Sequence, residues 1–194
     1  MSDRTRRQRP RFILLGIAQL ARGKADGLTQ FGATRESFLA SLAPLVAFPL
    51  VGSMLMLLDG GGLGSVSDLL MSLTALLAPP VLSFEVARLW GKEASWLHFA
   101  TAFNWCQWAI PVLGSLLLMV LGALMTLGLP AQAARLIAVI LLAGYALWLH
   151  WFIARHGLGL SAVRAAILVL VVNFATVALV VSPRVAGMTF GAGK

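Results

Sequence analysis

Five long apolar stretches constrain this chain more than any other feature of its sequence. Each has at least the roughly 20 residues that a helix needs to cross the hydrocarbon core of a bilayer, and short turns separate them. A water-soluble domain of this size cannot hide so much apolar surface. The sequence therefore predicts an all-α, polytopic membrane protein with a compact bundle of five transmembrane helices. The predicted helices cover residues 38–58, 66–90, 97–127, 133–154 and 160–181.

Composition agrees with a membrane location. Charged residues make up 11% of the 194 residues, whereas they make up about 25% of soluble domains. At this length one domain is expected, and we place a transmembrane domain at 38–182. Cys106 is the single cysteine, so neither an intrachain disulfide nor a cysteine metal cluster is predicted.

The distribution of basic residues predicts the orientation in the membrane. A net charge of +8 is also found in nucleic-acid binders, but here eight of the fifteen Lys and Arg residues precede residue 38. With the N-terminus in the cytoplasm, twelve basic residues lie inside and three outside, as the positive-inside rule requires. We therefore expect N-in/C-out topology, a short outer tail at 183–194 and no nucleic-acid partner. The Arg- and Ala-rich composition indicates a bacterial inner membrane.

The region before the first span is expected to lie on the membrane surface. Residues 1–11 are basic and are predicted to form a disordered, solvated tail. Residues 12–37 are predicted to form an amphipathic interfacial helix and a linker, because the apolar run 12–21 is too short to span. A cleaved signal peptide is the weaker reading, since no small-residue cleavage site follows Ala21. The basic side chains expected to face anionic lipid are Arg4, Arg6, Arg7, Arg9, Arg11, Arg22 and Lys24.

Three polar residues are predicted to share one depth in the membrane. Glu85 and His150 each lie five residues before a predicted cytoplasmic boundary, which is roughly 7 to 8 Å at about 1.5 Å per residue. Asn104 lies roughly 10 Å from the same side. A buried carboxylate needs a partner, and Arg88 follows Glu85 at the i+3 position of the same helix. Structural pairing is favoured over a proton or ion relay through Glu85 and His150.

The stretch NWCQWAIP, residues 104–111, places polar groups and a proline inside the third span. Asn104, Gln107 and Pro111 share a helix face, and Pro111 removes the N–H that would bond the Gln107 carbonyl. The same argument predicts helix breaks at Pro79 and Pro80. A packing seam is favoured over a substrate path through Glu85, Asn104, Gln107 and His150. Trp105 and Trp108 are expected to pack between helices, with binding of a lipid or quinone-like ring as the weaker reading.

Motifs of soluble enzymes are missing from the sequence. We find no phosphate loop, no HExxH, no GxSxG elbow and no carboxylate-rich loop for Mg²⁺. No catalytic residue, cofactor or metal is therefore predicted. Two functions stay open: a non-enzymatic scaffold, assembly factor or accessory subunit that contacts lipids, membrane proteins or a second copy, and a small transporter or channel.

The stretch GYALWLHWFIARHGLGLSAVRAAILVLVVN, residues 144–173, resembles the last two helices of the Yip-domain family. The similarity consists of an aromatic-rich span, a small basic turn and Gly-Leu-Ser before an Ala-rich span, and it would extend over residues 25–182. The resemblance implies a cytoplasmic N-terminal region and a bundle of five helices. Eukaryotic relatives bind Rab-type GTPases and help to shape membranes. The acidic and tyrosine-containing motifs of their N-terminal region are absent here, so GTPase binding is not expected.

Overall fold

The computed structural model describes residues 12–60 and 62–191, with side chains for residues 12–60 and 66–182. The predicted tail at 1–11, with five of the seven interfacial basic residues, lies outside the described residues. All secondary-structure elements among the described residues are helices, and no strand occurs there. In chain order the elements are α1 (Ile13–Ala21), the 3-10 helix η1 (Ala25–Gln30), α2 (Arg35–Leu58), α3 (Gly62–Leu89), α4 (Glu93–Cys106), α5 (Ala109–Thr126), α6 (Ala131–Gly157) and α7 (Ala162–Gly191).

The five predicted spans are confirmed as helices long and apolar enough to cross a membrane. They run over Arg35–Leu58, Val66–Leu89, Glu93–Thr126, Ala131–Gly157 and Ala162–Ser182. The first begins at Thr34, whose side-chain oxygen accepts a hydrogen bond from the Ser37 N–H at 3.2 Å, as an N-cap residue does. Gly91 adopts a left-handed conformation with φ of 65° where α3 ends, and the Lys92 N–H closes the turn on the Ala87 carbonyl at 2.8 Å.

The third span is not one helix. The α-helical hydrogen-bond pattern is interrupted at Gln107 and Trp108, between α4 and α5, although both residues keep helical backbone angles. Because Pro111 has no N–H, the Gln107 carbonyl accepts instead from the Ile110 N–H at 3.3 Å. The interruption therefore precedes Pro111 by one turn. The predicted breaks at Pro79 and Pro80 are wrong, since α3 runs through both prolines.

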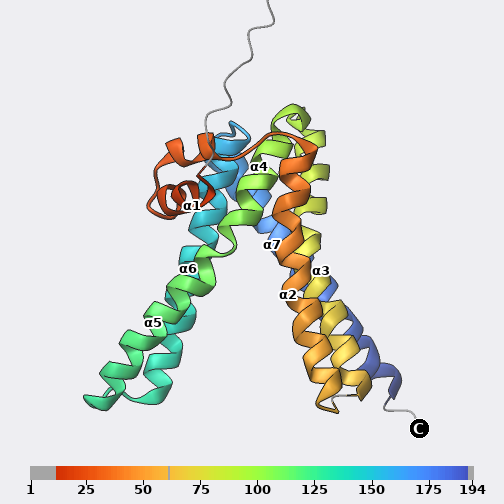
Figure 1. The fold of residues 1–194 in the computed structure, drawn as a ribbon, viewed down its shortest axis with the longest axis vertical. Helices are drawn as coiled ribbons and strands as arrows, with labels where there is room; N and C mark the ends of the chain where they lie inside the picture. The colour runs from red at the N-terminus through yellow and green to blue at the C-terminus, as the bar shows by residue number, and fades with distance from the viewer. Residues whose placement is uncertain (1–11, 61, 192–194) are drawn as a thin grey trace, which may run out of the picture.

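The helices form an inverted V (Figure 1). One end is compact and holds α1, η1, α4 and the nearby ends of the other helices; we call it the compact end. From it extend a two-helix leg, made by α5 and the first half of α6, and a three-helix leg, made by α2, α3 and the later part of α7 (Figure 1). Within the described residues α5 contacts α1, α4 and α6 but not α2, α3 or α7. The predicted compact bundle is therefore correct only for one end, because the α4–α5 bend directs α5 away from the other leg.

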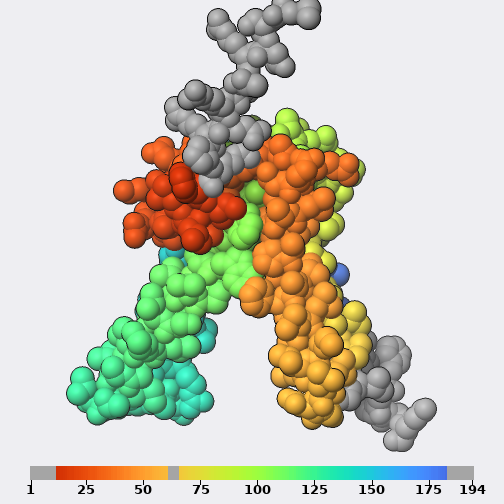
Figure 2. Space-filling model, viewed as in Figure 1, coloured from red at the N-terminus to blue at the C-terminus, as the bar shows by residue number. Residues whose placement is uncertain are grey.

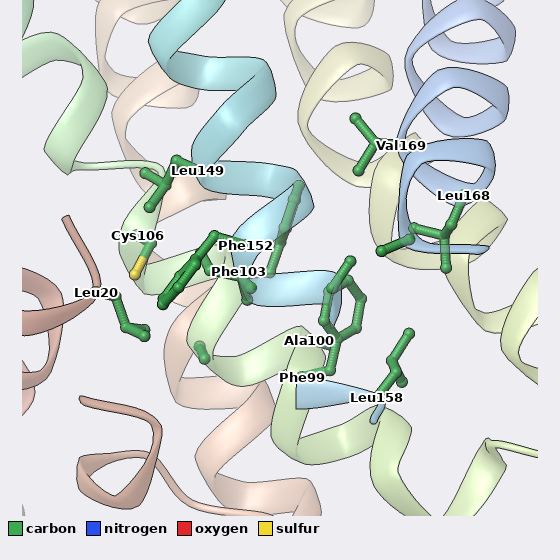
Figure 3. Close-up of a cluster of buried hydrophobic side chains, with 14 of the residues drawn as sticks. Leu20, Phe99, Ala100, Phe103, Cys106, Leu149, Phe152, Leu158, Leu168 and Val169 are labelled. Atoms are coloured by element: carbon green, nitrogen blue, oxygen red, sulfur yellow. The ribbon is translucent and has the colours of Figure 1, made fainter. Parts of the chain in front are cut away.

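The hydrophobic core lies in the compact end. Large side chains from α4, α6 and α7 meet there, with Leu20 of α1 added from the side (Figure 3). Small residues let the helices approach closely: a Cβ on Gly157 would lie only 3.2 Å from the Cβ of Phe99. The central core residues include Phe99, Phe103, Leu149, Phe152, Ile153, Leu158, Leu168 and Val169.

The N-terminal elements α1 and η1 fold into one unit that docks on the compact end. The Tyr145 hydroxyl of α6 donates to the Ala21 carbonyl at 2.9 Å, and His98 Nε2 of α4 donates to the Leu28 carbonyl at 2.8 Å. A helix does occupy the start of the predicted segment, and it ends at Ala21; its amphipathic, interfacial character stays a prediction. The rest of the segment forms η1 and the connection to α2.

Candidate functional site

Asn104 lies in a packing seam between α4 and α2. Its side-chain amide donates to the Ser41 hydroxyl at 3.0 Å, and the Ser41 hydroxyl donates to the Phe38 carbonyl at 2.6 Å. The exposed fractions of Asn104 and Ser41 are 1% and 0%. The Asn104 side-chain oxygen is also buried and has no hydrogen-bond partner among the described residues. The seam predicted for this stretch is thus present and joins α4 to α2.

Gln107 and Trp108 line an open, largely apolar crevice of about 370 Å³ beside the α4–α5 bend. The Phe48 ring of α2 lies 4.8 Å from the Trp108 ring, centroid to centroid. The indole N–H of Trp108 is buried and finds no partner within the described part of the chain. The remaining lining residues come from α2, α3 and α5: Leu45, Pro49, Leu76, Ile110 and Pro111.

His150 borders a small cavity of about 20 Å³, which we call the His150 cavity. The imidazole lies 4.7 Å from the Phe103 ring, and both of its nitrogens are buried without a hydrogen-bond partner among the described residues. Two other polar side chains reach the cavity, Ser83 of α3 and Asn173 of α7. Apolar residues complete its wall: Pro79, Phe99, Phe103, Leu168, Val169 and Val172.

Glu85 lies on the surface. Its carboxylate pairs with Arg88 at 2.6 Å, and the two side chains are 49% and 55% exposed. The i+3 pairing predicted from the sequence is confirmed. The four predicted residues do not share one site: Asn104 bonds α2, Gln107 lines the crevice, His150 borders its own cavity and Glu85 faces outward.

The tryptophan side chains make different contacts. Trp96 donates its indole N–H to Ser83 at 3.2 Å, and its ring lies between those of Phe38 and Phe84. Trp151 donates to the Ala162 carbonyl at 2.9 Å. Trp105 packs against the core. The core packing of Trp105 and the contact of Trp108 with Phe48 agree with the prediction made for these two rings.

Sequence reasoning missed three polar residues, Ser41, Ser83 and Asn173. Asn173 is a polar side chain inside an apolar span, so the rule that singled out Asn104 and His150 applies to it equally. Serine carries no comparable signal, because it commonly bonds a carbonyl of its own helix. Both serines do so, and only the fold reveals their second partners.

The fold and its polar contacts are those expected of a multi-pass helical membrane protein: five helices are long and apolar enough to cross a bilayer. No protein-family model matches the chain, and no curated protein or solved structure matches it either. The resemblance to the Yip-domain family stays a prediction. Among the described residues no group of three His, Cys, Asp or Glu side chains could hold a metal ion.

Proposed function

We propose that this chain is a non-enzymatic, multi-pass inner-membrane protein that acts as a scaffold, assembly factor or accessory subunit through contacts with lipids and other membrane proteins. The observation that carries the proposal is the divergence of the two legs (Figure 2). At the depth of the spans, it leaves apolar helix faces that this chain does not cover. Van der Waals packing with hydrocarbon or with another helix is the interaction such faces offer.

The arrangement of polar groups also supports a contact role. The Asn104, Ser41 and Trp96 side chains bond neighbouring helices, which is the use that membrane proteins make of small numbers of polar residues. Large apolar side chains on both legs are exposed, among them Phe48, Val51, Met54, Val112, Leu116 and Met119. Polar contacts thus hold the protein together, and apolar surface is left for its surroundings.

The crevice beside the α4–α5 bend is the favoured contact surface. It lies between α2, α3 and the start of α5, and Gln107 supplies a polar group in an otherwise apolar lining. A glutamine at such a place can hydrogen-bond a helix of a partner protein. Lipid acyl chains are the other molecules that can contact this crevice within the membrane.

A photo-crosslinking amino acid at Phe48, which lines the crevice, tests the proposal. The matched control position is Val139, which is 65% exposed on α6 and does not line the crevice. We expect Phe48 to give a discrete crosslinked protein or lipid band in native membranes, above the level at Val139. Equal, diffuse crosslinking at both positions, together with a protein that purifies alone after mild extraction, would refute a scaffold role.

The N-terminal unit is proposed to face the cytoplasm and anionic lipid. Arg22 and Lys24 are exposed on it, and basic side chains near a membrane surface are attracted by anionic headgroups. A tag after Lys194 should accordingly report from the outer side of the membrane. A tag accessible from the cytoplasm would reverse the proposed orientation.

The transporter alternative rests on a polar path through Glu85, Asn104, Gln107 and His150. The separation of these four side chains gives that path no support. Its test is proton or solute flux in reconstituted vesicles. A flux that Glu85→Gln abolishes would favour the transporter, and a flux that Glu85→Gln leaves unchanged would remove the relay through this carboxylate.

A further inference from the structure

We infer that the His150 cavity is a binding site for one water molecule, which joins α6 to α3 and α7. The inference rests on the unpartnered imidazole and the polar wall around it, and it is independent of the proposed scaffold role. It concerns the compact end, where His150 of α6, Ser83 of α3 and Asn173 of α7 line the same cavity.

The size of the cavity fits one water molecule. A site needs about 10–15 Å³ of probe-occupied volume to hold a water, and the cavity measures about 20 Å³. An acyl chain or an aromatic ring is far larger. Size alone does not hydrate a cavity, because cavities lined only by apolar groups stay dry.

The imidazole supplies the first requirement for a bound water, a buried polar group that lacks a partner. Neutral histidine offers one N–H donor and one acceptor nitrogen. Neither His150 nitrogen has a hydrogen-bond partner among the described residues, and both are buried. A buried polar group left in this state is destabilising, so a water that bonds it is stabilised at this place.

Ser83 and Asn173 supply the second requirement, further polar partners. The Ser83 hydroxyl donates to the Pro80 carbonyl at 2.9 Å and accepts from Trp96 at 3.2 Å, which leaves one lone pair for a water to use. The Asn173 amide donates one hydrogen to the Val169 carbonyl at 2.8 Å, which leaves its other hydrogen and its carbonyl oxygen. With His150, the cavity thus offers the two to four partners that buried waters use.

A metal ion fits the same wall poorly. The nine lining residues include one imidazole, one hydroxyl and one amide, but no carboxylate or thiol. A divalent cation would keep most of its charge uncompensated in an apolar surrounding, which is costly. A neutral molecule that both donates and accepts hydrogen bonds matches the wall instead.

Water-edited NMR on the full chain in lipid nanodiscs, with ¹⁵N,¹³C-labelled histidine, tests the inference. The chain has three histidines. His156 is exposed and serves as the positive control for water contact, while His98 reports the docked N-terminal unit through its bond to Leu28. We expect magnetisation transfer from water to the His150 ring, and a ¹⁵N shift typical of a hydrogen-bonded nitrogen. A wild-type His150 ring with neither signal overturns the inference.

Two variants that fill the His150 cavity test whether the water lies there. Val172→Phe and the milder Val169→Ile enlarge side chains of the cavity wall and leave its polar groups in place. We expect the water transfer to His150 to fall at least several-fold in a variant whose His98 signal is unchanged. A transfer that persists at the wild-type level in both variants, with His98 unchanged, shows that the water lies elsewhere and overturns the assignment to this cavity.

Discussion

The Asn104 side-chain amide donates to the Ser41 hydroxyl at 3.0 Å, and this bond joins α4 to α2 in the interior of the protein. Both residues are almost completely buried. The two helices belong to different parts of the V: α2 runs down the three-helix leg, whereas α4 leads into the two-helix leg (Figure 1). The bond therefore lies where the two legs are held together.

Removing either partner of this bond should destabilise the protein. Ser41→Ala leaves the buried Asn104 amide without its acceptor, at a cost of about 1–3 kcal/mol. A double-mutant cycle with Asn104→Leu should give a coupling of about 0.6 kcal/mol and at most about 1.7 kcal/mol, the range for interhelical bonds in membranes. Reversible unfolding in bicelles measures both quantities. Additive single-variant effects would mean that the bond contributes nothing to the association of α2 with α4.

Tyr145→Phe should loosen the N-terminal unit. The substitution removes the hydroxyl that donates to the Ala21 carbonyl and keeps the ring, at a cost of about 1 kcal/mol. Trypsin cleavage after the exposed Arg22 and Lys24 measures the effect, because cleavage of a docked segment follows its local opening. We expect roughly a fivefold faster cleavage. An unchanged rate, in a variant with unchanged global stability, would show that this bond does not hold the unit.

The absence of a side chain at two glycines should be critical for the packing of α1 on η1. A Cβ at Gly27 would lie 2.7 Å from the Gly16 carbonyl oxygen, and one at Gly16 would lie 2.8 Å from the Phe31 ring. Gly27→Ala should therefore separate η1 from α1, since its clash is with backbone. Gly144→Ala is the control, because no atom lies within 4 Å of a Cβ built there. The trypsin assay should show rapid cleavage for Gly27→Ala and wild-type cleavage for Gly144→Ala. Equal rates would contradict the close packing.

The spans were predictable because an apolar stretch long enough to cross a bilayer must satisfy its own backbone hydrogen bonds there, and an α-helix does so within one segment. The pairing of Glu85 with Arg88 was predictable for a related reason, since residues three apart share a helix face. Both inferences use only the distance between residues along the chain. Neither requires knowledge of which helix lies beside which.

The arrangement of the helices was not predictable in the same way. Depth along a span follows from sequence position, and that is why Glu85, Asn104 and His150 could be predicted to share one depth. Rotation about each helix axis depends on packing, and it turns Asn104 toward α2, His150 toward α3 and α7, and Glu85 to the surface. The docking of α1 and η1 likewise depends on partners more than 60 residues away, Tyr145 for α1 and His98 for η1.

Pro111→Ala should alter the divergence of the legs. The substitution restores an N–H that can bond the Gln107 carbonyl, which now accepts from Ile110 at 3.3 Å. A proline within a helix costs about 3 kcal/mol, so its removal favours continuous α-helical hydrogen bonding through Gln107 and Trp108. Because α5 begins directly after these two residues, straightening the bend would move the whole two-helix leg.

Spin labels at the two leg tips measure this movement. Leu58 and Leu127 are 74% and 82% exposed and lie at the ends of α2 and α5; the labels need a background in which the buried Cys106 is replaced by alanine. We expect a shifted inter-label distance in Pro111→Ala. Pro49→Ala is the matched control, because α2 is already helical through Pro49 and the distance should stay at its wild-type value. If Pro111→Ala also keeps the wild-type distance, the bend is held by tertiary contacts such as the packing of Phe48 on Trp108, and the missing N–H is not its cause.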